Sequence, residues 1–284
     1  MRAAKAIPLE DELGDVLDKA QHCAGLNVEQ LAARAHVTVE KIQNAEDYRY
    51  EDLTDDDLHR LSRALCLNEV GLCALARSRY PRPRTTGLPF CVHPMRLPFG
   101  VGVVNAYAVV DCANGVGVLF DGGTGFGALQ SVWPKAVTRI EAAFLTHPEA
   151  EHVGGLPGAL QQHGLDAYYG PRGGRPRPEC WPLGEGETVV VAGYQITAFS
   201  TPGQCAEHNC YVVRPKGVPL GRALLISGDL IFAGSLGGGY FSCSQVLRHA
   251  RRILGALPGS TVIAPGHGPM TTVENERRYN PFLV

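Results

Sequence analysis

The stretch FLTHPEAEHVGGLPGAL, residues 144–160, joins an apolar run to a group of polar side chains. Its first residues end the run IEAAFLT, which predicts a β-strand, and a helix is expected from about Val153 onward. Between them stand four side chains that bind metals in proteins: His147, Glu149, Glu151 and His152. Because sites in layered α/β folds are built at strand ends, this stretch predicts a metal centre.

Three further predicted strands lead to side chains of the same kind. They are Gln204 and His208 after YQITAFS, Asp229 after ALLISG, and His267 after TVIAP. Each of these residues, taken alone, could stand in an ordinary polar loop. Their order and spacing together favour one shared centre, which we expect to hold two divalent metal ions.

The residues around these positions predict an α/β domain over residues 90–284. The β-branched runs VGVVNAYAVVD and VGVLFD flank Asn114-Gly115, a dipeptide typical of a β-hairpin. Further strands are predicted at 140–146, 188–193, 194–200, 209–214, 222–228 and 260–268. Helices are predicted at about 126–133, after Val153, and at about 244–256.

Residues 1–80 predict a separate, all-α domain. Its helices are expected to begin after good N-cap residues: Asp11 or Asp15, Asn27, Thr38, Thr54 and Asn68. Residues 81–89 are rich in proline and lack periodicity, which predicts a linker between the two domains.

The segment GLNVEQLAARAHVTVEKIQNAED, residues 25–47, resembles a helix-turn-helix of the phage-repressor type. That resemblance implies that the helix after Thr38 enters the major groove of DNA. Residues 1–80, however, hold 10 Lys/Arg against 15 Asp/Glu. Because DNA affinity depends on neutralising phosphates, this balance argues against DNA binding. It favours a module that forms a homodimer or lines the active-site entrance, with a protein partner as the alternative.

Composition points to an ordinary globular protein. Of the 284 residues, 45% are hydrophobic and 19% are charged, and no apolar run approaches the roughly 20 residues of a membrane helix. No secretory leader is evident at the start of the sequence, so we expect a cytoplasmic protein that does not engage a membrane. The nine cysteines are odd in number and scattered in spacing, which predicts mostly reduced thiols.

The order of segments in residues 90–284 resembles the metallo-β-lactamase superfamily in its glyoxalase II-like branch. The segments are NAYAVV, FDGG, FLTHPEAEHVGGLPGAL, STPGQCAEHNCYVV, SGDLIFAGSLGG and VIAPGHGPMTTVENERRYNPFL. The resemblance implies a four-layer αβ/βα fold with a dinuclear metal site. It also implies that Asp229 bridges the two metals and that His267 completes the second site.

Two motifs depart from the pattern of that superfamily. The first is usually Thr-His-x-His-x-Asp-His, and here Glu149 replaces the second His and Glu151 the Asp. The second is usually Thr-Pro-Gly-His, and here Gln204 replaces the His, so His208 could supply the missing nitrogen. The resemblance assigns His147, Glu149 and Gln204 or His208 to one site. It assigns Glu151, His152 and His267 to the other.

The His-x-Glu pattern is also similar to the flavodiiron proteins, which have a Glu at the same place. Additional oxygen ligands favour iron over zinc, with manganese as a further candidate. The resemblance predicts a hydrolase of a thioester or another activated ester, with Glu151 and Asp229 as catalytic residues and a small-molecule substrate. Two alternatives are a diiron oxidoreductase or sensor of oxygen or nitric oxide, and a metal-poor regulatory or interaction protein.

Overall fold

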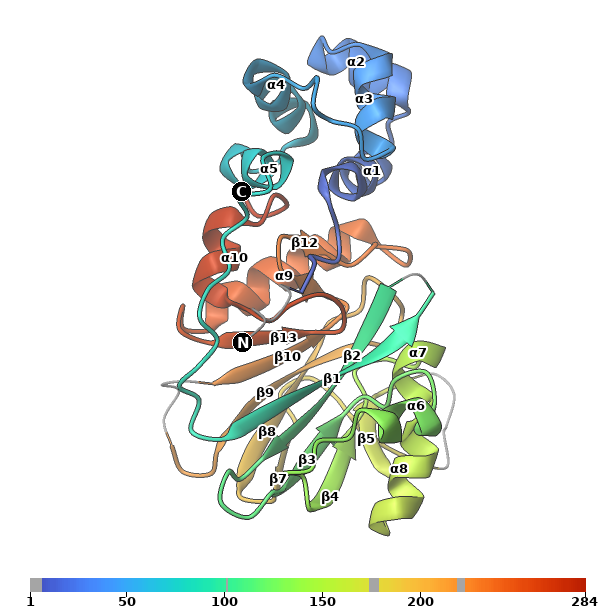
Figure 1. Cartoon of the computed structure of the whole chain (residues 1–284), viewed down its shortest axis with the longest axis vertical. Helices are drawn as coiled ribbons and strands as arrows, with labels where there is room; N and C mark the ends of the chain where they lie inside the picture. Colours follow the sequence, from blue (N-terminus) through green and yellow to red (C-terminus); the bar gives the residue numbers. More distant parts are fainter. Residues whose placement is uncertain (1–6, 101, 174–178, 219–222) are drawn as a thin grey trace, which may run out of the picture.

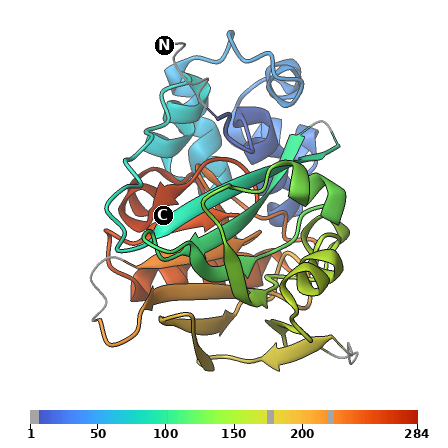
Figure 2. The ribbon, with the colours of Figure 1, turned by 60° about the horizontal axis from the view of Figure 1, so that its bottom comes forward.

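The computed structural model describes residues 7–100, 102–173, 179–218 and 223–284. Two six-stranded sheets face each other, and helices cover the outer side of each sheet (Figure 1). Figure 2 shows the same layers from a second direction. This is the four-layer αβ/βα fold that the sequence predicts. None of the helices described is long and apolar enough to cross a membrane.

The first sheet has the order β1-β2-β3-β4-β5-β6. Its strands are Cys91–Phe99, Gly102–Val110, Val116–Phe120, Arg139–Phe144, Tyr168–Pro171 and Cys180–Leu183. The helices beside it are α6 (Phe126–Ser131), α7 (Ala150–Val153) and α8 (Leu156–His163). Strands β2 and β3 form the antiparallel hairpin expected at Asn114-Gly115, whereas β3, β4, β5 and β6 run parallel.

The second sheet has the order β14-β13-β10-β9-β8-β7. In chain order its strands are β7 (Thr188–Val191), β8 (Tyr194–Ser200), β9 (Asn209–Pro215), β10 (Leu224–Gly228), β13 (Val262–Pro265) and β14 (Thr271–Thr272). A short hairpin, β11 (Ile231–Phe232) and β12 (Ser235–Leu236), follows β10. The helices on this side are α9 (Cys243–Ala256) and α10 (Val273–Tyr279).

Strand β1 is one of several elements that the sequence reading did not single out. It contains Pro94 and Pro98, which weaken a strand signal because proline cannot donate a ladder hydrogen bond. The structure places it at the edge of the sheet, where this loss is tolerated. The short elements β5, β6, β11, β12, β14 and α10 were also not predicted. Val101 and Arg222, at the ends of two predicted strands, lie outside the described residues.

Alternation along the strands builds separate apolar layers. On β2, Tyr107 and Val109 lie in the cluster between the two sheets. The intervening residues Ala106 and Ala108 lie in the cluster between the first sheet and its helices. Because side chains of a strand point alternately to opposite faces, one strand serves both layers. This explains the nearly continuous apolar character of the sequence in this region.

Five helices precede the sheets, as the capping residues predict. They are α1 (Leu13–Ala24), α2 (Val28–Ala35), α3 (Val39–Glu46), α4 (Asp55–Leu65) and α5 (Glu69–Ala76). Asn27, Thr38, Thr54 and Asn68 each accept a backbone N–H bond as the N-cap of the helix that follows. For α1 the N-cap is Glu12 rather than Asp11 or Asp15, and Asp15 takes the reciprocal place in its capping box.

The five helices do not stand apart from the sheets. Their buried leucines share one hydrophobic cluster with residues of β9, β10, α9 and α10. The backbone N–H of Asn68 donates to the carbonyl of Pro281 at 2.6 Å. The buried hydroxyl of Tyr80 donates to the carboxylate of Glu276 on α10 at 3.0 Å. In Figure 1, α1 and α5 lie next to α9 and α10, and α2, α3 and α4 lie farther from the sheets.

The expectation of mostly reduced thiols needs correction. Cys23 on α1 is bonded to Cys243 on α9, and Cys91 is bonded to Cys112. Each pair joins segments that the fold brings together, and the first pair is 220 residues apart in sequence. Spacing along the chain therefore could not reveal it. The other five cysteines form no disulfide with any residue that the structure describes.

A substitution at Gly71 can test how closely α5 packs against the C-terminal residues. A Cβ at Gly71 would lie 1.9 Å from the carbonyl oxygen of Tyr279. We therefore expect Gly71→Ala to lower the free energy of unfolding by about 1–3 kcal/mol, as overpacking does. Gly127→Ala is the matched control because its Cβ would meet nothing within 4 Å. Urea denaturation measures both, and equal stabilities would contradict this packing.

Asp57 tests the junction between α3 and α4. Burial by itself would raise the pKa of Asp57, but hydrogen bonds from Lys41, Thr54 and Arg60 outweigh it and hold the pKa well below its usual range. The ionised form therefore contributes stability above pH ~4, and this contribution is lost as the pH falls.

We expect Asp57→Asn to cost about 1–3 kcal/mol of unfolding free energy at pH 7 and less below pH ~4. Asp56→Asn, at an exposed position of the same helical turn, is the control. Thermal unfolding at several pH values gives the comparison. A cost for Asp57→Asn that does not change with pH would refute the role of its charge.

Candidate metal centre

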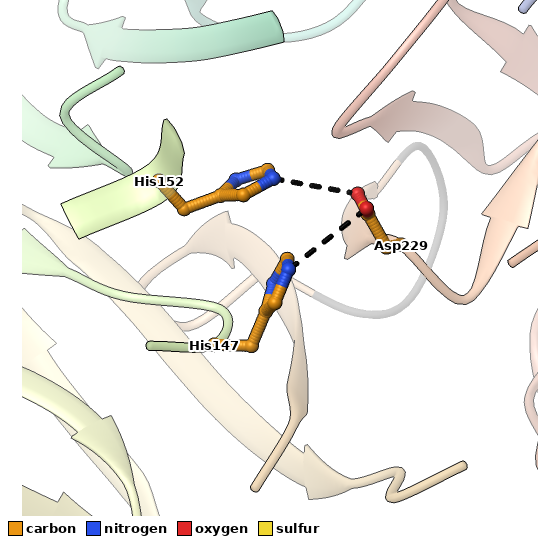
Figure 3. Close-up of side chains that lie close together, drawn as sticks. All are labelled: His147, His152 and Asp229. Carbon is orange, nitrogen blue, oxygen red and sulfur yellow. Dashed lines mark ion pairs between the residues drawn. The ribbon is translucent and has the colours of Figure 1, made fainter. Parts of the chain in front are cut away.

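Three imidazoles surround the carboxylate of Asp229. The Nε2 atom of His152 lies 3.6 Å from Oδ1 of Asp229, and the Nε2 atoms of His147 and His267 lie 3.9 and 3.5 Å from Oδ2. Figure 3 shows the rings of His147 and His152 both pointing toward Asp229. All four side chains are buried. The structure thus brings together residues that lie up to 120 positions apart in the sequence, as predicted from the strand ends.

Each imidazole is held by a partner at its other nitrogen. Nδ1 of His147 lies 2.9 Å from the hydroxyl of Thr146, which itself donates to Asp121 and so accepts from the ring. Nδ1 of His152 donates to Asp121 at 3.0 Å, and Nδ1 of His267 donates to the carbonyl of Val103 at 3.0 Å. These contacts place the Nδ1 proton of the neutral imidazole away from the centre, so that Nε2 of each neutral ring would present its lone pair to a metal ion.

The converging atoms lack partners of their own. The Nε2 atoms of His147 and His152 and the Oδ1 atom of Asp229 are buried without a hydrogen bond to any described residue. Buried polar atoms without partners are rare in proteins. Two ligands that each lie about 2.1 Å from one tetrahedral ion are about 3.4 Å apart, close to the separations seen here. The donor set therefore fits a divalent metal ion.

Glycines allow the close approach of this cluster. Gly228, directly before Asp229, has a φ of 48°, and a Cβ there would lie 2.7 Å from Nε2 of His208. A Cβ at Gly266, directly before His267, would lie 2.1 Å from Oδ1 of Asp229. Any larger residue at either position would displace a member of the cluster. The motifs SGD and PGH thus place their last residues by means of the glycine that precedes them.

His208 stands behind the centre rather than in it. Its Nδ1 lies 2.7 Å from the hydroxyl of Thr201, and its Nε2 accepts the backbone N–H of Asp229 at 3.1 Å. Burial, followed by the nearby His147, lowers the pKa of His208 well below its usual value, so the ring is neutral. Because both ring nitrogens are engaged, this geometry suits a residue that positions Asp229 rather than a metal ligand.

Glu149 and Gln204 form a pair at the edge of the centre. The amide nitrogen of Gln204 donates to Oε1 of Glu149 at 3.0 Å, and Oε2 of Glu149 lies 3.6 Å from Nε2 of His147. The neighbouring imidazole of His147 is the main cause of a lowered pKa for Glu149. Gln204 therefore steadies the carboxylate that stands where the superfamily pattern has a histidine.

Glu151 is placed differently from the other candidates. It lies half-buried on the short helix α7, and no hydrogen bond or ion pair joins it to the other seven predicted residues among those described. On a helix, neighbouring residues point in different directions, so His152 faces the centre while Glu151 does not. The run of polar residues in this loop therefore suggests more ligands in the sequence than the structure brings together at one point.

Asp121 and Glu10 are two residues of the site that sequence reasoning missed. Asp121 follows β3 and accepts hydrogen bonds from Thr146 and His152, so it orients two of the imidazole-bearing segments. Asp121 belongs to the motif FDGG, which is visible in the sequence. The role of Asp121, however, depends on contacts that only the fold creates. Glu10 precedes α1, and its Oε1 lies 3.7 Å from Nδ1 of His267. Nothing near Glu10 in the sequence indicated that contact.

The centre is electrostatically biased toward a cation. Burial by itself would raise the pKa of Asp229, but the combined effect of His152, His147, His267 and His208 lowers it to about 2. The carboxylate is therefore anionic at neutral pH. An anion that is buried without a hydrogen bond to one of its oxygens is a strong binding position for a metal ion.

Asp121 offers a test of how the imidazoles are oriented. We expect Asp121→Asn to weaken binding of divalent metal by about 10- to 100-fold, because it removes the carboxylate behind His152. Competition with a chromophoric chelator measures the affinity. Asp111→Asn, which alters an exposed aspartate in a turn, is the control. An unchanged affinity in folded Asp121→Asn would show that this carboxylate does not support the centre.

Known proteins share this fold and parts of this sequence. Residues 99–202 match the family model of the metallo-beta-lactamase superfamily. A hydroxyacylglutathione hydrolase of Salmonella arizonae is 32% identical over 127 residues, which cover 45% of this chain and 47% of the relative. The chain thus spans about half the length of the curated relatives that it matches.

Solved structures of other proteins share this fold. A metallo-beta-lactamase from Staphylococcus aureus subsp. aureus COL has a TM-score of 0.55 at 18% identity, covering 67% of this chain and 62% of that chain. The protein TTHA1623 in a di-iron-bound form has a TM-score of 0.50 at 25% identity, covering 67% of this chain and all of that chain. These likenesses show that the chain has the metallo-β-lactamase fold.

Proposed function

We propose that this protein is a metal-dependent hydrolase of a thioester or another activated ester. The observation that carries the proposal is the convergence of three buried Nε2 atoms on the Asp229 carboxylate, with several of these atoms lacking a hydrogen bond. The likeness to a hydroxyacylglutathione hydrolase over about half of that relative supports a thioester as the substrate class.

The ligand set divides into two sides. His147 and Glu149 would hold one ion, His152 and His267 would hold the other, and Asp229 would lie between them. Bound divalent ions would supply an activated water and polarise the substrate carbonyl. We leave Glu151, Gln204 and His208 outside the ligand set, because their contacts in this structure place them around it.

The residues of the chain determine how well this chemistry proceeds. Thr146, Asp121 and the carbonyl of Val103 fix the imidazoles, so little reorganisation is needed during the reaction. Water adds to the acyl carbon, the carbon–sulfur bond breaks, and the thiol leaves with a proton. The anionic Glu149, where the superfamily pattern has a neutral histidine, lowers the positive charge of the centre. We therefore expect slower hydrolysis than in relatives with the histidine.

A diiron oxidoreductase or a sensor of oxygen or nitric oxide is the second candidate. Glu149 favours it, because an added oxygen ligand suits iron better than zinc. The likeness to TTHA1623, whose structure was solved in a di-iron-bound form, is in keeping with this candidate. Manganese would also accept this ligand set. A metal-poor interaction protein fits less well, because it leaves the buried Nε2 atoms without a role.

The helical region, residues 13–76, is proposed as an accessory domain rather than a DNA reader. Helices α2 and α3 have the order expected of a helix-turn-helix, but the region carries the acidic balance noted above. Its packing against α9 and α10 is in keeping with a structural role beside the active site. The two disulfides weigh against the cytoplasmic location predicted from the sequence, because thiols are kept reduced there.

Metal analysis combined with one variant tests the hydrolase. We expect protein purified without added metal to contain close to two ions per chain, and to hydrolyse a hydroxyacylglutathione. His267→Ala should reduce this activity by about 100-fold and remove about one ion, because it deletes one of the ligands. His163→Ala, on the outer helix α8, is the control.

The outcome of this experiment also separates the two candidates. Two irons per chain, an oxygen-dependent change in absorbance and no thioester hydrolysis would replace the hydrolase with the diiron candidate. Less than about half an ion per chain, not restored by incubation with iron, zinc or manganese, would refute both.

A further inference from the structure

A cavity of about 370 Å³ lies between the helical region and α9. Residues of α1, α2 and α4 form one side of it, and residues of β12 and α9 form the other. Its size falls in the range of pockets that hold small molecules. None of the residues proposed as metal ligands lines the cavity, whereas Leu236, Gly237 and Phe282 of the lining fall in segments that carry the resemblance to the superfamily.

The interior of the cavity is apolar. Leu65 and Leu67 line it from the helical region, and Val246, Leu247 and Phe282 line it from the opposite side. Each of these side chains remains partly or wholly buried in the protein. Surfaces of this kind bind an alkyl chain or another apolar body, because burial removes its surface from water.

The charged side chains of the lining are all basic. They are Lys19, Arg34 and Arg251, and no Asp or Glu lines the cavity among the residues described. Lys19 is already paired with Asp11 and donates to the carbonyl of Leu236. Arg34 and Arg251 are exposed and form no ion pair or hydrogen bond with any described residue. Two unpaired guanidinium groups beside an apolar cavity suit an anionic head group.

A covalent link holds the two sides of the cavity together. The disulfide between Cys23 and Cys243 joins α1 to α9, and both cysteines belong to the lining. The separation of the walls therefore changes little when the surrounding helices fluctuate. A cavity that is already formed loses less free energy on binding than one that must be assembled.

We propose that this cavity binds a small organic anion with an apolar body, of the kind represented by a medium-length alkyl carboxylate or alkyl phosphate. The apolar walls hold the alkyl part, and Arg34 and Arg251 bind the anionic head. The proposal rests on the cavity and its charges, and it is independent of the proposed function.

The cavity shares a wall with the metal centre. Leu236 and Gly237 line the cavity, and a Cβ at Gly237 would lie 1.9 Å from the carbonyl oxygen of Asp229. The same Cβ would lie 3.3 Å from Cβ of Gln204. A bound anion would therefore contact a backbone segment that packs directly against Asp229, so the site is placed to influence the metal centre.

Calorimetric titration of the oxidised full-length protein tests the proposal. Decanoate and decyl phosphate are the probes, and decanol is the uncharged comparison. We expect at least one of the two anions to bind, and decanol to bind about tenfold more weakly or not at all. A preference between decanoate and decyl phosphate identifies the head group. Absence of binding by both anions at 1 mM, on the order of the weakest useful affinity, would overturn the proposal.

Three variants localise the binding. Arg34→Gln and Arg251→Gln should each weaken binding by about tenfold, because each removes one charged contact. Arg248→Gln is the matched control, since Arg248 is exposed on the same helix α9 but does not line the cavity. Ala24→Trp, at an exposed lining position of α1, should block the cavity.

The variants decide between this cavity and a non-specific apolar surface. Equal binding by the wild-type protein, Arg34→Gln and Arg251→Gln would refute the proposal. Binding that survives Ala24→Trp in a folded protein would also refute it, because the probe would then occupy another surface. Circular dichroism of each variant establishes that it is folded.

Discussion

The position of the Asp229 carboxylate is the constraint on which the rest of the αβ/βα fold depends. It is a buried anion, and it can remain so only while neighbouring groups compensate for the water that it has lost. Those neighbours come from α7 and from the ends of β4 and β13, and thus from both sheets, while Asp229 itself follows β10. The two sheets must therefore keep a fixed position relative to each other. Residues 228 and 266 must also remain glycine, because a side chain at either position would displace the cluster. The fold and the site therefore depend on the same arrangement of the two sheets.

The convergence of His147, His152, Asp229 and His267 could be predicted from the sequence, because strand ends gather at one edge of a sheet. Their division of roles could not be predicted, since it depends on contacts between segments distant in sequence. His208 looks like a ligand in the sequence, and only the N–H of Asp229 beside its Nε2 indicates another role. Asp121 does not look like a site residue in the sequence. Only its hydrogen bonds with Thr146 and His152 show that it belongs to the site.

Elements of the fold likewise differ in whether they depend on nearby residues or on residues distant in the sequence. Capping residues such as Asn27 and Thr54 act within a few residues of themselves, so the sequence predicts the helices that they begin. Strand β1 and the disulfide between Cys23 and Cys243 depend on partners elsewhere in the chain, and local patterns do not reveal them. The continuous core that joins the helical region to α9 and α10 is of the same kind. Local sequence patterns such as charge and capping determine where the helices begin. Only the packing of side chains shows that the helical region and the sheets share one core.

The contact between Glu10 and His267 has a consequence for how this chain can be divided. A cut at the proline-rich segment 81–89 appears natural in the sequence, yet it would take away a carboxylate that lies beside one of the imidazoles. It would also expose the apolar faces of α9 and α10 and break the disulfide connection to α1. The αβ/βα part of this chain is therefore not an independent unit that can be separated from the first helices. Its recombination with other N-terminal regions would require a substitute for the surface that the first helices now cover.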